Sequence, residues 1–325
     1  MFQIQESQNR MSPFFSIIIP LYNKERHIKA TIESVLAQTF QDFEIIVVND
    51  GSTDESKIVI ESIEEDRIQL FNIKNQGVSH ARNYGIRKAS SSLIVFLDAD
   101  DLWETNHLEN IKTLYEAFPN CGLYATAYLK KSNQTTIASV YKNIPTKMNW
   151  MGVIEDYFES CSINSIAWTS AVMVPKSIIE SVGYFNENIT LGAGEDTDLW
   201  IRIALKHQVA FSNKATAIHN LHSDNRISNS NTNLRQFIDL DVYEDAAKSN
   251  ISLKKYLDLN RFSIAIQYKL IGNNTKAKHL IDAMDATNLN AKQRSLLKLN
   301  KTALKVALKI KNGLQNSGVI LSSFR

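Results

Sequence analysis

Three carboxylates follow a run of five apolar residues in the first third of the chain. Residues 93–97 read LIVFL, which is typical of a strand buried on both faces of a parallel sheet, and Asp98, Asp100 and Asp101 come next. Like charges this close repel one another and desolvated carboxylates are costly, so we expect a cation nearby. Asp98 and Asp100 lie two residues apart and can leave the same side of an extended segment. Oxygen-rich sites of this kind suit Mg²⁺ or Mn²⁺ together with substrate phosphates.

A simpler interpretation is that some of these acids cap a helix. A helix that begins near residues 102–104 would gain from a capping carboxylate at Asp100 or Asp101. Capping accounts for one acid and leaves Asp98 unexplained. The sequence therefore favours a site for a metal and phosphates over a helix cap.

A second acidic cluster follows a glycine-rich segment, residues 191–194. Glu195, Asp196 and Asp198 come next, and the apolar pattern of residues 199–205 predicts a largely buried helix. The helix dipole favours acids at this end, so capping is again the simpler interpretation. One acid suffices for a cap, and three within four positions exceed that need. We therefore interpret this cluster as functional too.

The elements that must position these acids alternate between strands and helices over the first hundred residues. Such alternation is typical of a parallel α/β sheet, and Pro20, which cannot donate to a ladder, is expected to end the first strand. The predicted strands are 14–19, 43–48, 68–71 and 93–97, and the predicted helices are 26–38, one that carries Ile58, Val59 and Ile63, and 77–88.

Ligands of such sheets bind beyond the carboxyl ends of the strands. The loops at those ends are residues 20–23, 49–54, 75–77 and 98–101, which are polar throughout and acidic in two cases. Neither a G-x-G-x-x-G nor a G-x-x-x-x-G-K-[ST] motif occurs, which argues against a dinucleotide site or a P-loop. A nucleotide would be held by acids and a metal instead.

The alternation of strands and helices is less regular after Asp101. We expect a helix over 104–118, a strand over 122–130, a polar stretch to 147, a strand over 166–174 and a helix over 175–182. From residue 231 onward the apolar spacing is helical and glycine is scarce. The chain thus divides into a tail (1–13), a main domain (14–230, with halves at about 14–101 and 102–230) and a helical C-terminal region (231–325).

The composition of the chain narrows the class of protein and its cellular compartment. The chain has 325 residues, 44% hydrophobic and 22% charged, and a net charge of +2, which gives no argument for nucleic acid. Its two cysteines, Cys121 and Cys161, fit a reducing cytosol better than a disulfide framework. Residues 1–10 lack the apolar core of a signal peptide, and no apolar run approaches the roughly 18–20 residues that span a bilayer. We expect a cytoplasmic protein, at most peripheral on the inner face of the membrane.

Five motifs in order resemble those of the family 2 inverting glycosyltransferases, which have the GT-A fold. They are IIIPLYN (17–23), VNDGSTD (48–54), GVSHARNYG (77–85), LDADD (97–101) and GEDTDLW (194–200), so the resemblance covers roughly residues 14–225. It implies a Rossmann-like nucleotide-binding half with a mostly parallel central sheet, here with a C-terminal helical extension. It also implies a nucleotide-sugar donor, usually a UDP-sugar, and Mn²⁺ or Mg²⁺ on its diphosphate.

The resemblance assigns roles residue by residue. Tyr22 and Asp50 match positions that hold the uracil and its ribose, and Arg82 matches the arginine that helps to position the nucleotide. Asp98 matches the acid that contacts the ribose and the donor sugar, and Asp100 matches the metal-binding acid. Pro20, Asn23 and Ala99 lie within the same motifs and are expected to line the nucleotide-sugar site.

The resemblance also assigns a role in acceptor activation to the second acidic cluster. Asp196 matches the general base of the family, with Glu195 beside it as an alternative. Inversion requires an acceptor hydroxyl to attack the anomeric carbon from the face opposite the departing UDP, and a carboxylate base contributes about 10²–10⁴-fold to such a step. The resemblance further implies a downstream histidine as a metal or diphosphate ligand, for which His219 is preferred to His222. Arg226 could reach a phosphate, although solvated loop arginines are commoner.

The end of the chain is basic. No acidic side chain follows Asp285, and apolar residues alternate with the cations. A helix of this kind can lie on an anionic membrane surface, and the alternative is a helix packed on the main domain with a solvated basic face. The basic residues are Lys292, Arg294, Lys298, Lys301, Lys305, Lys309, Lys311 and Arg325, with a formal charge of +8.

The leading function is transfer of a hexosyl or N-acetylhexosaminyl group to a saccharide or a lipid-linked saccharide, in bacterial-type assembly of cell-surface polysaccharide. A sugar-nucleotide pyrophosphorylase is an alternative, but such enzymes usually carry a glycine-rich phosphate loop after the first strand, and residues 20–23 lack one. A non-catalytic nucleotide-sugar-binding module is a second alternative. The presence of Asp98, Asp100 and Asp196 together argues against it.

Overall fold

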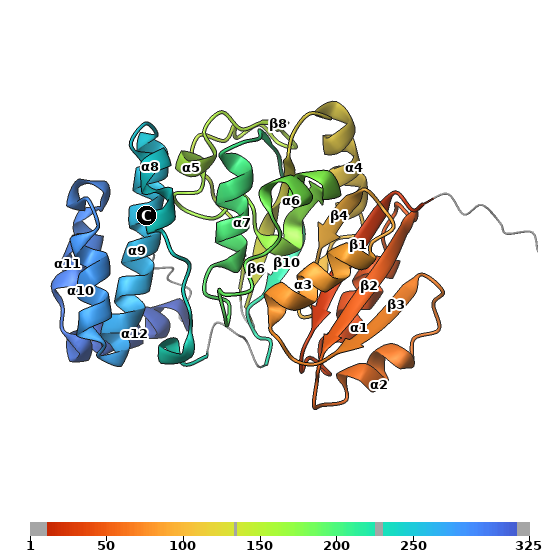
Figure 1. Cartoon of the computed structure of the whole chain (residues 1–325), viewed down its shortest axis with the longest axis horizontal. Helices are drawn as coiled ribbons and strands as arrows, with labels where there is room; N and C mark the ends of the chain where they lie inside the picture. Colours follow the sequence, from red (N-terminus) through yellow and green to blue (C-terminus); the bar gives the residue numbers. More distant parts are fainter. Residues whose placement is uncertain (1–11, 133–134, 225–229, 317–325) are drawn as a thin grey trace, which may run out of the picture.

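Parallel strands form the first half of a mixed sheet in the computed structural model, which describes residues 12–132, 135–224 and 230–316, without the side chains of 312–316. The elements of this half are β1 (Phe15–Leu21), α1 (Ile28–Leu36), β2 (Phe43–Asp50), α2 (Ser56–Glu61), β3 (Ile68–Ile73), α3 (Val78–Lys88) and β4 (Leu93–Phe96). The strands are parallel and lie in the order β3-β2-β1-β4 (Figure 1). The predicted alternation of strands and helices is confirmed.

The central strands are buried on both faces because helices cover both. In β1, Ile17 and Ile19 belong to a core with α1 and α4 (His107–Ala117), whereas Ile18 belongs to the core on the opposite face, with α3. Gly85 allows α3 to approach closely, since a Cβ at this position would lie 2.6 Å from Cγ2 of Ile18. The two cores fix the carboxyl ends of the strands relative to the helices that follow them.

β1 continues through Pro20, so the prediction that this residue ends the strand is wrong. The ladder between β1 and β4 stops at the pair Ile18–Phe96, while the ladder to β2 continues to Leu21. The N–H that Pro20 lacks therefore interrupts no bond to β4. The extra length carries β1 to the rim of the sheet, where Tyr22 follows.

The second half of the sheet is mixed. Its strands are β5 (Leu102–Trp103), β6 (Leu123–Lys131), β7 (Thr136–Ala138), β8 (Met151–Val153), β9 (Val172–Pro175) and β10 (Val209–Asn220). β9 is antiparallel to both β4 and β6, and β6 and β10 are parallel. The described residues thus form one sheet of ten strands, with a principal order β3-β2-β1-β4-β9-β6-β10-β5.

Two predictions for the second half need correction. The helix expected over 104–118 starts later, at His107, because Leu102 and Trp103 pair with β10 as β5. The strand expected over 166–174 is shorter, since Thr169–Ala171 forms a turn of 3₁₀ helix, η1, before β9 begins. In both places long-range pairing decides the local structure, and local apolar spacing does not reveal it.

Helices α6 (Lys176–Val182) and α7 (Glu195–Ala204) follow β9, as predicted. Gly194 occupies the N-cap position of α7 with φ of +104°, where a Cβ would lie 2.9 Å from Cγ2 of Ile238. Both the left-handed backbone and the close contact require glycine. No side chain caps α7, and the first turn instead presents Glu195, Asp196 and Asp198.

The C-terminal region is helical, as predicted, and lies at the end of the molecule opposite β3 (Figure 1). Its core helix, α9, packs against α5 and is contacted in turn by α10, α11 and α12. Leu253 and Leu257 of α9 share a core with Leu199 and Trp200 of α7. The helices are α5 (Tyr157–Ser160), α8 (Glu244–Ala247), α9 (Ile251–Ile271), α10 (Asn274–Asp282), α11 (Ala291–Lys298) and α12 (Lys301–Asn316).

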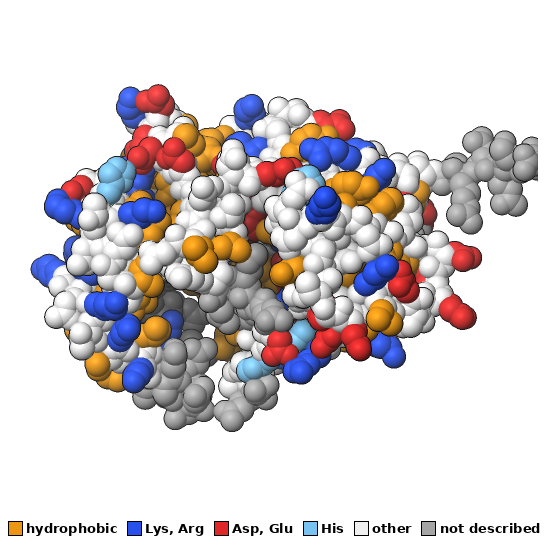
Figure 2. Space-filling view, turned by 60° about the horizontal axis from the view of Figure 1, so that its bottom comes forward, with side chains coloured by type: hydrophobic (Ala, Val, Ile, Leu, Met, Phe, Trp, Pro, Cys, Tyr) orange, Lys and Arg blue, Asp and Glu red, His pale blue; other side chains and the backbone are white. Residues whose placement is uncertain are grey.

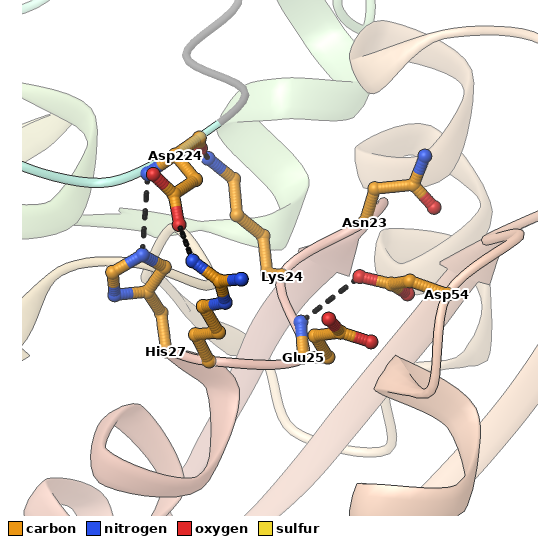
Figure 3. Close-up of a pocket in the computed structure, with 7 residues that line it drawn as sticks. Asn23, Lys24, Glu25, His27, Asp54 and Asp224 are labelled. Atoms are coloured by element: carbon orange, nitrogen blue, oxygen red, sulfur yellow. Dashed lines mark hydrogen bonds and ion pairs between the residues drawn. The ribbon is translucent and has the colours of Figure 1, made fainter.

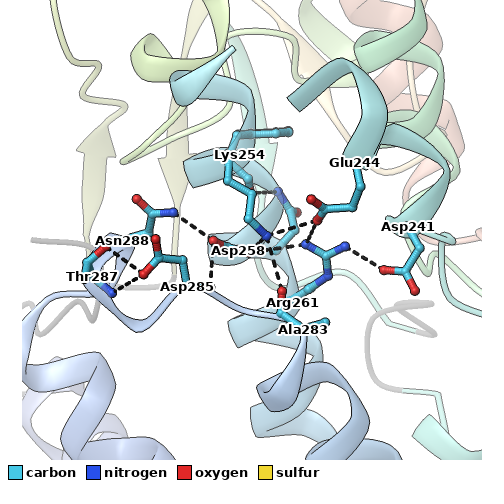
Figure 4. A network of polar contacts seen from close by, with 11 residues as sticks. Asp241, Glu244, Lys254, Asp258, Arg261, Ala283, Asp285, Thr287 and Asn288 are labelled. Carbon is cyan, nitrogen blue, oxygen red and sulfur yellow. Dashed lines mark hydrogen bonds and ion pairs between the residues drawn. The ribbon is translucent and has the colours of Figure 1, made fainter. Parts of the chain in front are cut away.

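A buried arginine organises this region. Arg261 of α9 is inaccessible to solvent and forms ion pairs with Asp241, Glu244 and Asp258, at 2.6, 2.5 and 3.3 Å (Figure 4). Lys254 reaches Glu244 and Asp258 as well, at 3.1 and 2.9 Å. The Asp258 carboxylate also accepts from the backbone N–H of Asp285, at 3.1 Å, which ties the segment after α10 to α9.

The predicted basic end consists of two helices, α11 and α12, separated by Leu299 and Asn300. Leu304 is buried, whereas Val306, Leu308 and Ile310 of α12 are exposed. Arg325 and residues 1–11 of the expected tail lie outside the described residues. Among the helices that the structure describes, none has the length and apolar character needed to cross a membrane.

Candidate active site

One cavity of about 370 Å³ lies at the carboxyl ends of β1, β2 and β4, facing the first turn of α7. Both acidic clusters of the sequence reach it, although nearly a hundred residues separate them. The predicted site residues that line it are Pro20, Tyr22, Asp50, Arg82, Asp98, Ala99, Asp100, Glu195 and Asp196. Asn23 and His219 are the predicted residues that do not line it.

Arg82 joins the two acidic clusters. Its Nη2 donates to Oδ1 of Asp98 at 2.7 Å, and its Nη1 donates to Oε1 of Glu195 at 3.2 Å. The guanidinium lies 5.2 Å from the ring centroid of Phe185. Burial alone would lower the pKa of Arg82, but the neighbouring carboxylates of Asp98 and Glu195 raise it above the usual range. Arg82 is thus a fixed cation at the back of the cavity.

Glu195 is the most strongly constrained acid of the site. Burial and the nearby Asp196 raise its pKa to about 6, and Arg82 opposes this rise. Its Oε2 is buried and makes no hydrogen bond to any described residue. A carboxylate with one oxygen on Arg82 and one unsatisfied oxygen can accept a donor from a ligand or share a proton near neutral pH.

Asp196 lines the cavity beside Glu195 and is more exposed. Its Oδ1 accepts from the backbone N–H of Thr197 at 2.7 Å, and its Oδ2 faces the hydroxyl of Thr169 at 3.4 Å. These contacts leave each carboxylate oxygen with further lone pairs. Asp196 therefore has the position and the accessibility that a general base requires, and its role remains a prediction.

Asp50 shapes the opposite wall. Its Oδ1 accepts from the backbone N–H of Gln76 at 2.8 Å, and its Oδ2 accepts from that of Gly77 at 2.9 Å. Burial raises the pKa of Asp50, and these two bonds moderate the rise. Gly77 adopts φ of +94°, so the bonds hold the turn that begins α3. Asp50 is a rigid acceptor on the rim where Tyr22, which is 46% exposed, also lies.

The cation expected beside the first acidic cluster is supplied in part by the protein. Arg82 pairs with Asp98, and Nζ of Lys24 lies 2.7 Å from Oδ2 of Asp100. Lys24 directly follows the predicted loop 20–23, and this ion pair was not predicted from the sequence. The sequence feature that could have revealed this role is a lysine just after a strand, in a sheet where a neighbouring strand is followed by three acids.

Asp101 has a structural role that differs from helix capping. It is buried, accepts from the hydroxyl of Ser170 at 2.6 Å and from the backbone N–H of Asn220 at 3.0 Å. Burial and the adjacent Asp100 and Asp98 raise its pKa well above the usual range. The N-cap position of α4 belongs to Asn106, so the capping interpretation of Asp100 and Asp101 is wrong.

Asn23 lies in a neighbouring pocket, which Figure 3 shows. It adopts φ of +51°, and its side chain accepts from the backbone N–H of Thr53 at 2.8 Å, so it ties the loop after β1 to the loop after β2. In the same pocket the N–H of Asp224 donates to His27 at 3.2 Å, and Arg26 pairs with Asp224 at 3.1 Å. Asn23 thus supports the cavity from outside.

His219 stacks on Trp168, with ring centroids 4.9 Å apart and an interplanar angle of 30°. Trp168 lines the cavity, so the histidine contacts the wall and does not line the cavity itself. His222 is exposed, and Arg226 lies outside the described residues. The predicted metal role of His219 remains a prediction.

Several cavity residues had no motif to reveal them. Trp168 and Thr169 come from η1 and its approach, and Leu191 and Gly192 come from the loop before α7. These segments read as a strand and a flexible approach in the sequence. The antiparallel insertion of β9 beside β4 brings η1 to Asp98, whose backbone N–H donates to the hydroxyl of Ser170 at 3.1 Å.

The donor set suits a divalent cation that also binds a ligand. The described residues contain no group of three or more His, Cys, Asp or Glu side chains that could hold a metal alone. Asp100, which lines the cavity, offers a carboxylate, and Mg²⁺ is commonly bound by one or two carboxylates plus substrate phosphates. The residues present therefore fit a metal that arrives with a diphosphate.

The sequence of this chain matches a known protein family and several of its members. The family model described as "Glycosyl transferase family 2" matches residues 16–182. An Escherichia coli protein, "UDP-Glc:alpha-D-GlcNAc-diphosphoundecaprenol beta-1,3-glucosyltransferase WfaP", is 30% identical over 269 residues, which are 82% of this chain and 89% of that protein. An "Uncharacterized glycosyltransferase" of Rickettsia bellii is 32% identical over 215 residues, or 65% of this chain. The chain spans only 29–31% of the length of this and two further rickettsial relatives.

A solved structure shares the fold. The crystal structure of S. aureus TarS 1-349 in complex with UDP-GlcNAc has a TM-score of 0.56 and 17% sequence identity, over 88% of this chain and 78% of that one. The same protein in complex with UDP matches with a TM-score of 0.52, also at 17% identity. At this identity the likeness concerns the architecture alone.

Proposed function

Because this chain belongs to family 2 of the glycosyltransferases and has their GT-A fold, we propose that it transfers a sugar from a UDP-sugar to a saccharide acceptor with inversion. The transferred group is a hexosyl or N-acetylhexosaminyl unit. The observation that carries the proposal is the convergence of both acidic clusters and Arg82 on one cavity. Family membership also leaves the pyrophosphorylase alternative without support.

The donor is proposed to lie along the carboxyl ends of β1, β2 and β4. Tyr22 and Asp50 stand on one rim, where an exposed ring can stack on uracil and a rigid carboxylate can accept from its N–H. Arg82 and Asp98 stand at the back, where the ion pair fixes the carboxylate toward the ribose and the donor sugar. Solved TarS complexes with UDP and UDP-GlcNAc support this class of donor.

A divalent cation, Mn²⁺ or Mg²⁺, would be held by Asp100 together with the donor diphosphate. When bound, it would neutralise the charge that develops on the departing UDP. Lys24 already contacts this carboxylate and would remain as a second positive charge beside the diphosphate. Asp196, at the other side of the sugar, would accept the proton of the attacking hydroxyl.

The acceptor is proposed to be a saccharide or a lipid-linked saccharide of cell-surface polysaccharide assembly. The printed name of the Escherichia coli relative specifies a diphosphoundecaprenol-linked acceptor. Lys and Arg side chains gather over the C-terminal helices, at the left of Figure 2, and α12 adds exposed Val306, Leu308 and Ile310. We therefore propose a cytoplasmic enzyme that associates peripherally with the inner face of the membrane.

The test is release of UDP from a panel of UDP-sugars, with Mn²⁺ or Mg²⁺ and with excess EDTA. We expect turnover of at least one UDP-sugar, loss of turnover in EDTA, and loss in Asp100→Ala. Calorimetry should show weaker UDP binding by Asp50→Ala with the fold intact, although the loss of two backbone hydrogen bonds lowers the melting temperature. Turnover that survives EDTA would contradict the proposed metal dependence. Tighter binding of GDP than of UDP would contradict the assignment of uridine. The absence of turnover with every donor would favour a non-catalytic binding module.

A further inference from the structure

A second cavity, of about 210 Å³, adjoins the proposed donor cavity across Asp196. Asp196 and Trp168 line both cavities. Oδ2 of Asp196 faces Thr169, which lines the donor cavity, whereas Oδ1 is bonded to Thr197, which lines the second cavity. The carboxylate proposed as the base therefore stands between the two spaces.

Helix α9 forms one wall of this second cavity. Tyr256, Leu259, Asn260 and Ser263 line it, at the spacing that places residues on one face of a helix. Nδ2 of Asn260 donates to the backbone carbonyl of Tyr256 at 2.8 Å, which fixes the orientation of the amide. The C-terminal region, outside the segment matched by the family model, thus contributes directly to the surroundings of Asp196.

The lining has the mixed character that suits a neutral sugar ring. Ile163, Leu259 and Trp168 offer apolar surface, while hydroxyl and amide groups come from Ser162, Ser165, Thr197, Asn260 and Ser263. Among the described residues that line it, Asp196 is the only carboxylate and none is Lys or Arg. Burial raises the pKa of the Cys161 thiol to about 12, so this group stays neutral. The volume lies below the roughly 300–1,000 Å³ typical of drug-sized ligands, which fits a single ring.

We propose that this second cavity binds the terminal pyranose ring of the acceptor, and that helix α9 thereby helps to select it. The inference rests on the proposed function, because it takes Asp196 as the base. The acceptor hydroxyl oxygen would form a bond to the anomeric carbon, its proton would pass to Asp196, and the carbon–oxygen bond to UDP would break with its electron pair on the diphosphate. Asn260 is assigned as a specificity-determining residue that hydrogen-bonds the ring.

The experiment compares the full-length parent with Ser263→Phe, which fills the cavity, and with Asn260→Ala, which removes one polar group. Asn274→Ala, at an exposed position of α10, is the matched control. The probes are the methyl α- and β-glycosides of glucose, galactose, mannose, N-acetylglucosamine and N-acetylgalactosamine, added with UDP. Saturation-transfer NMR reports binding, and transfer from the active UDP-sugar to the best glycoside gives kcat and KM.

We expect Ser263→Phe to lose the saturation-transfer signal and to reduce transfer by about 100-fold or more, with UDP affinity unchanged. Asn260→Ala should raise the KM for the glycoside by about 3- to 10-fold at unchanged kcat, as expected for one lost hydrogen bond. Asn274→Ala should match the parent. If Ser263→Phe fails to bind UDP because it misfolds, the KM of Asn260→Ala for the glycoside decides whether α9 contacts the acceptor.

Parental glycoside binding and KM in Asn260→Ala, or parental transfer in folded Ser263→Phe, would overturn the assignment of α9. So would the absence of binding of every glycoside to a parent that releases UDP from its donor. A parent that releases no UDP from any donor, yet binds a glycoside in a manner sensitive to Ser263→Phe, would instead overturn the proposed function and leave the second cavity as a sugar site.

Discussion

Two buried arginines, Arg82 and Arg261, stand in clusters of carboxylates at opposite parts of the molecule, and the clusters differ in what surrounds them. Both guanidinium groups pair with at least two acids, and in both the Nε makes no hydrogen bond to any described residue. The acids of Arg82, Asp98 and Glu195, line a cavity. Of the acids of Arg261, Asp258 lies on α9 itself, and Asp241 and Glu244 lie just before α9, on a 3₁₀ turn (Asp241–Tyr243) and on α8 (Figure 4).

The difference shows that a buried ion pair by itself does not mark a functional site. Desolvation of charges is costly, and the mutual attraction of the pair only partly offsets that cost. Around Arg261, protein groups such as Lys254 and the N–H of Asp285 satisfy both oxygens of the buried Asp258 carboxylate. Around Arg82, Oε2 of Glu195 is buried without a partner and the cavity is open beside it. The incomplete cluster is the one arranged to meet a ligand.

The largest effect is expected in the incomplete cluster, on the rate of transfer. Asp196→Asn keeps the size of the side chain but removes its basicity, so kcat should fall by about 10²–10⁴-fold with UDP-sugar affinity nearly unchanged. Steady-state transfer and calorimetry on the same preparation measure both. Glu195→Gln is the control, because the neighbour shares the site. A near-parental kcat in Asp196→Asn would end its assignment as the base.

The second-largest effect is expected on the free energy of unfolding, and it should differ between variants of Arg82 and Arg261. Arg261→Met should lower the free energy of unfolding by about 3–5 kcal/mol, because Asp258 would remain buried without this partner. Arg82→Met should cost less stability, since its acids border a cavity, but should reduce turnover by about 10²–10³-fold.

Urea unfolding and kcat of the folded fraction, measured for both variants, test the comparison. Arg261→Met should retain parental kcat per folded molecule. If Arg82→Met is the less stable variant and Arg261→Met the less active one, the assignment of the two clusters is reversed.

A smaller effect appears in the dependence of stability on pH. The pKa of Glu195 is raised from 4.5 to about 6, so between these pH values the folded chain holds more of this proton than the unfolded chain. Stability therefore falls as pH rises through this window, by about 2 kcal/mol from this group. Glu195→Gln should remove that part of the slope, as measured by urea unfolding from pH 4.5 to 7. A slope identical to that of the parent would show that Glu195 titrates normally.

The smallest effect concerns the surface beyond the Arg261 cluster. Lys305→Glu with Lys309→Glu, both exposed on α12, should weaken binding to vesicles that contain anionic lipid by about 30-fold at low salt, since each basic residue near the surface contributes about 1 kcal/mol. Lys29→Glu with Lys57→Glu, on α1 and α2, is the matched control. Equal co-sedimentation of the two double variants would favour α12 as a helix that merely packs on α9.

Much of the donor half could be predicted from the sequence, because buried parallel strands read as apolar runs and their polar loops must meet at one edge. Asp50 and Asp98, which follow two of these strands, line one cavity at that edge. Contacts set by long-range packing could not be predicted. No local pattern distinguishes Asp101, which binds Ser170 inside the protein, from its neighbours, and none places Asn260 of α9 beside the second acidic cluster.

Helix α9 brings its own anchorage with it, since Arg261, Lys254 and Asp258 lie on it and their partners Asp241 and Glu244 lie just ahead of it in the chain. Residues 241–261 therefore hold an ionic anchor within one short segment, and an apolar seam joins this segment to α5 and α7. If α9 is the acceptor wall that we propose, exchange of this segment would change the acceptor site and leave the proposed donor cavity in place.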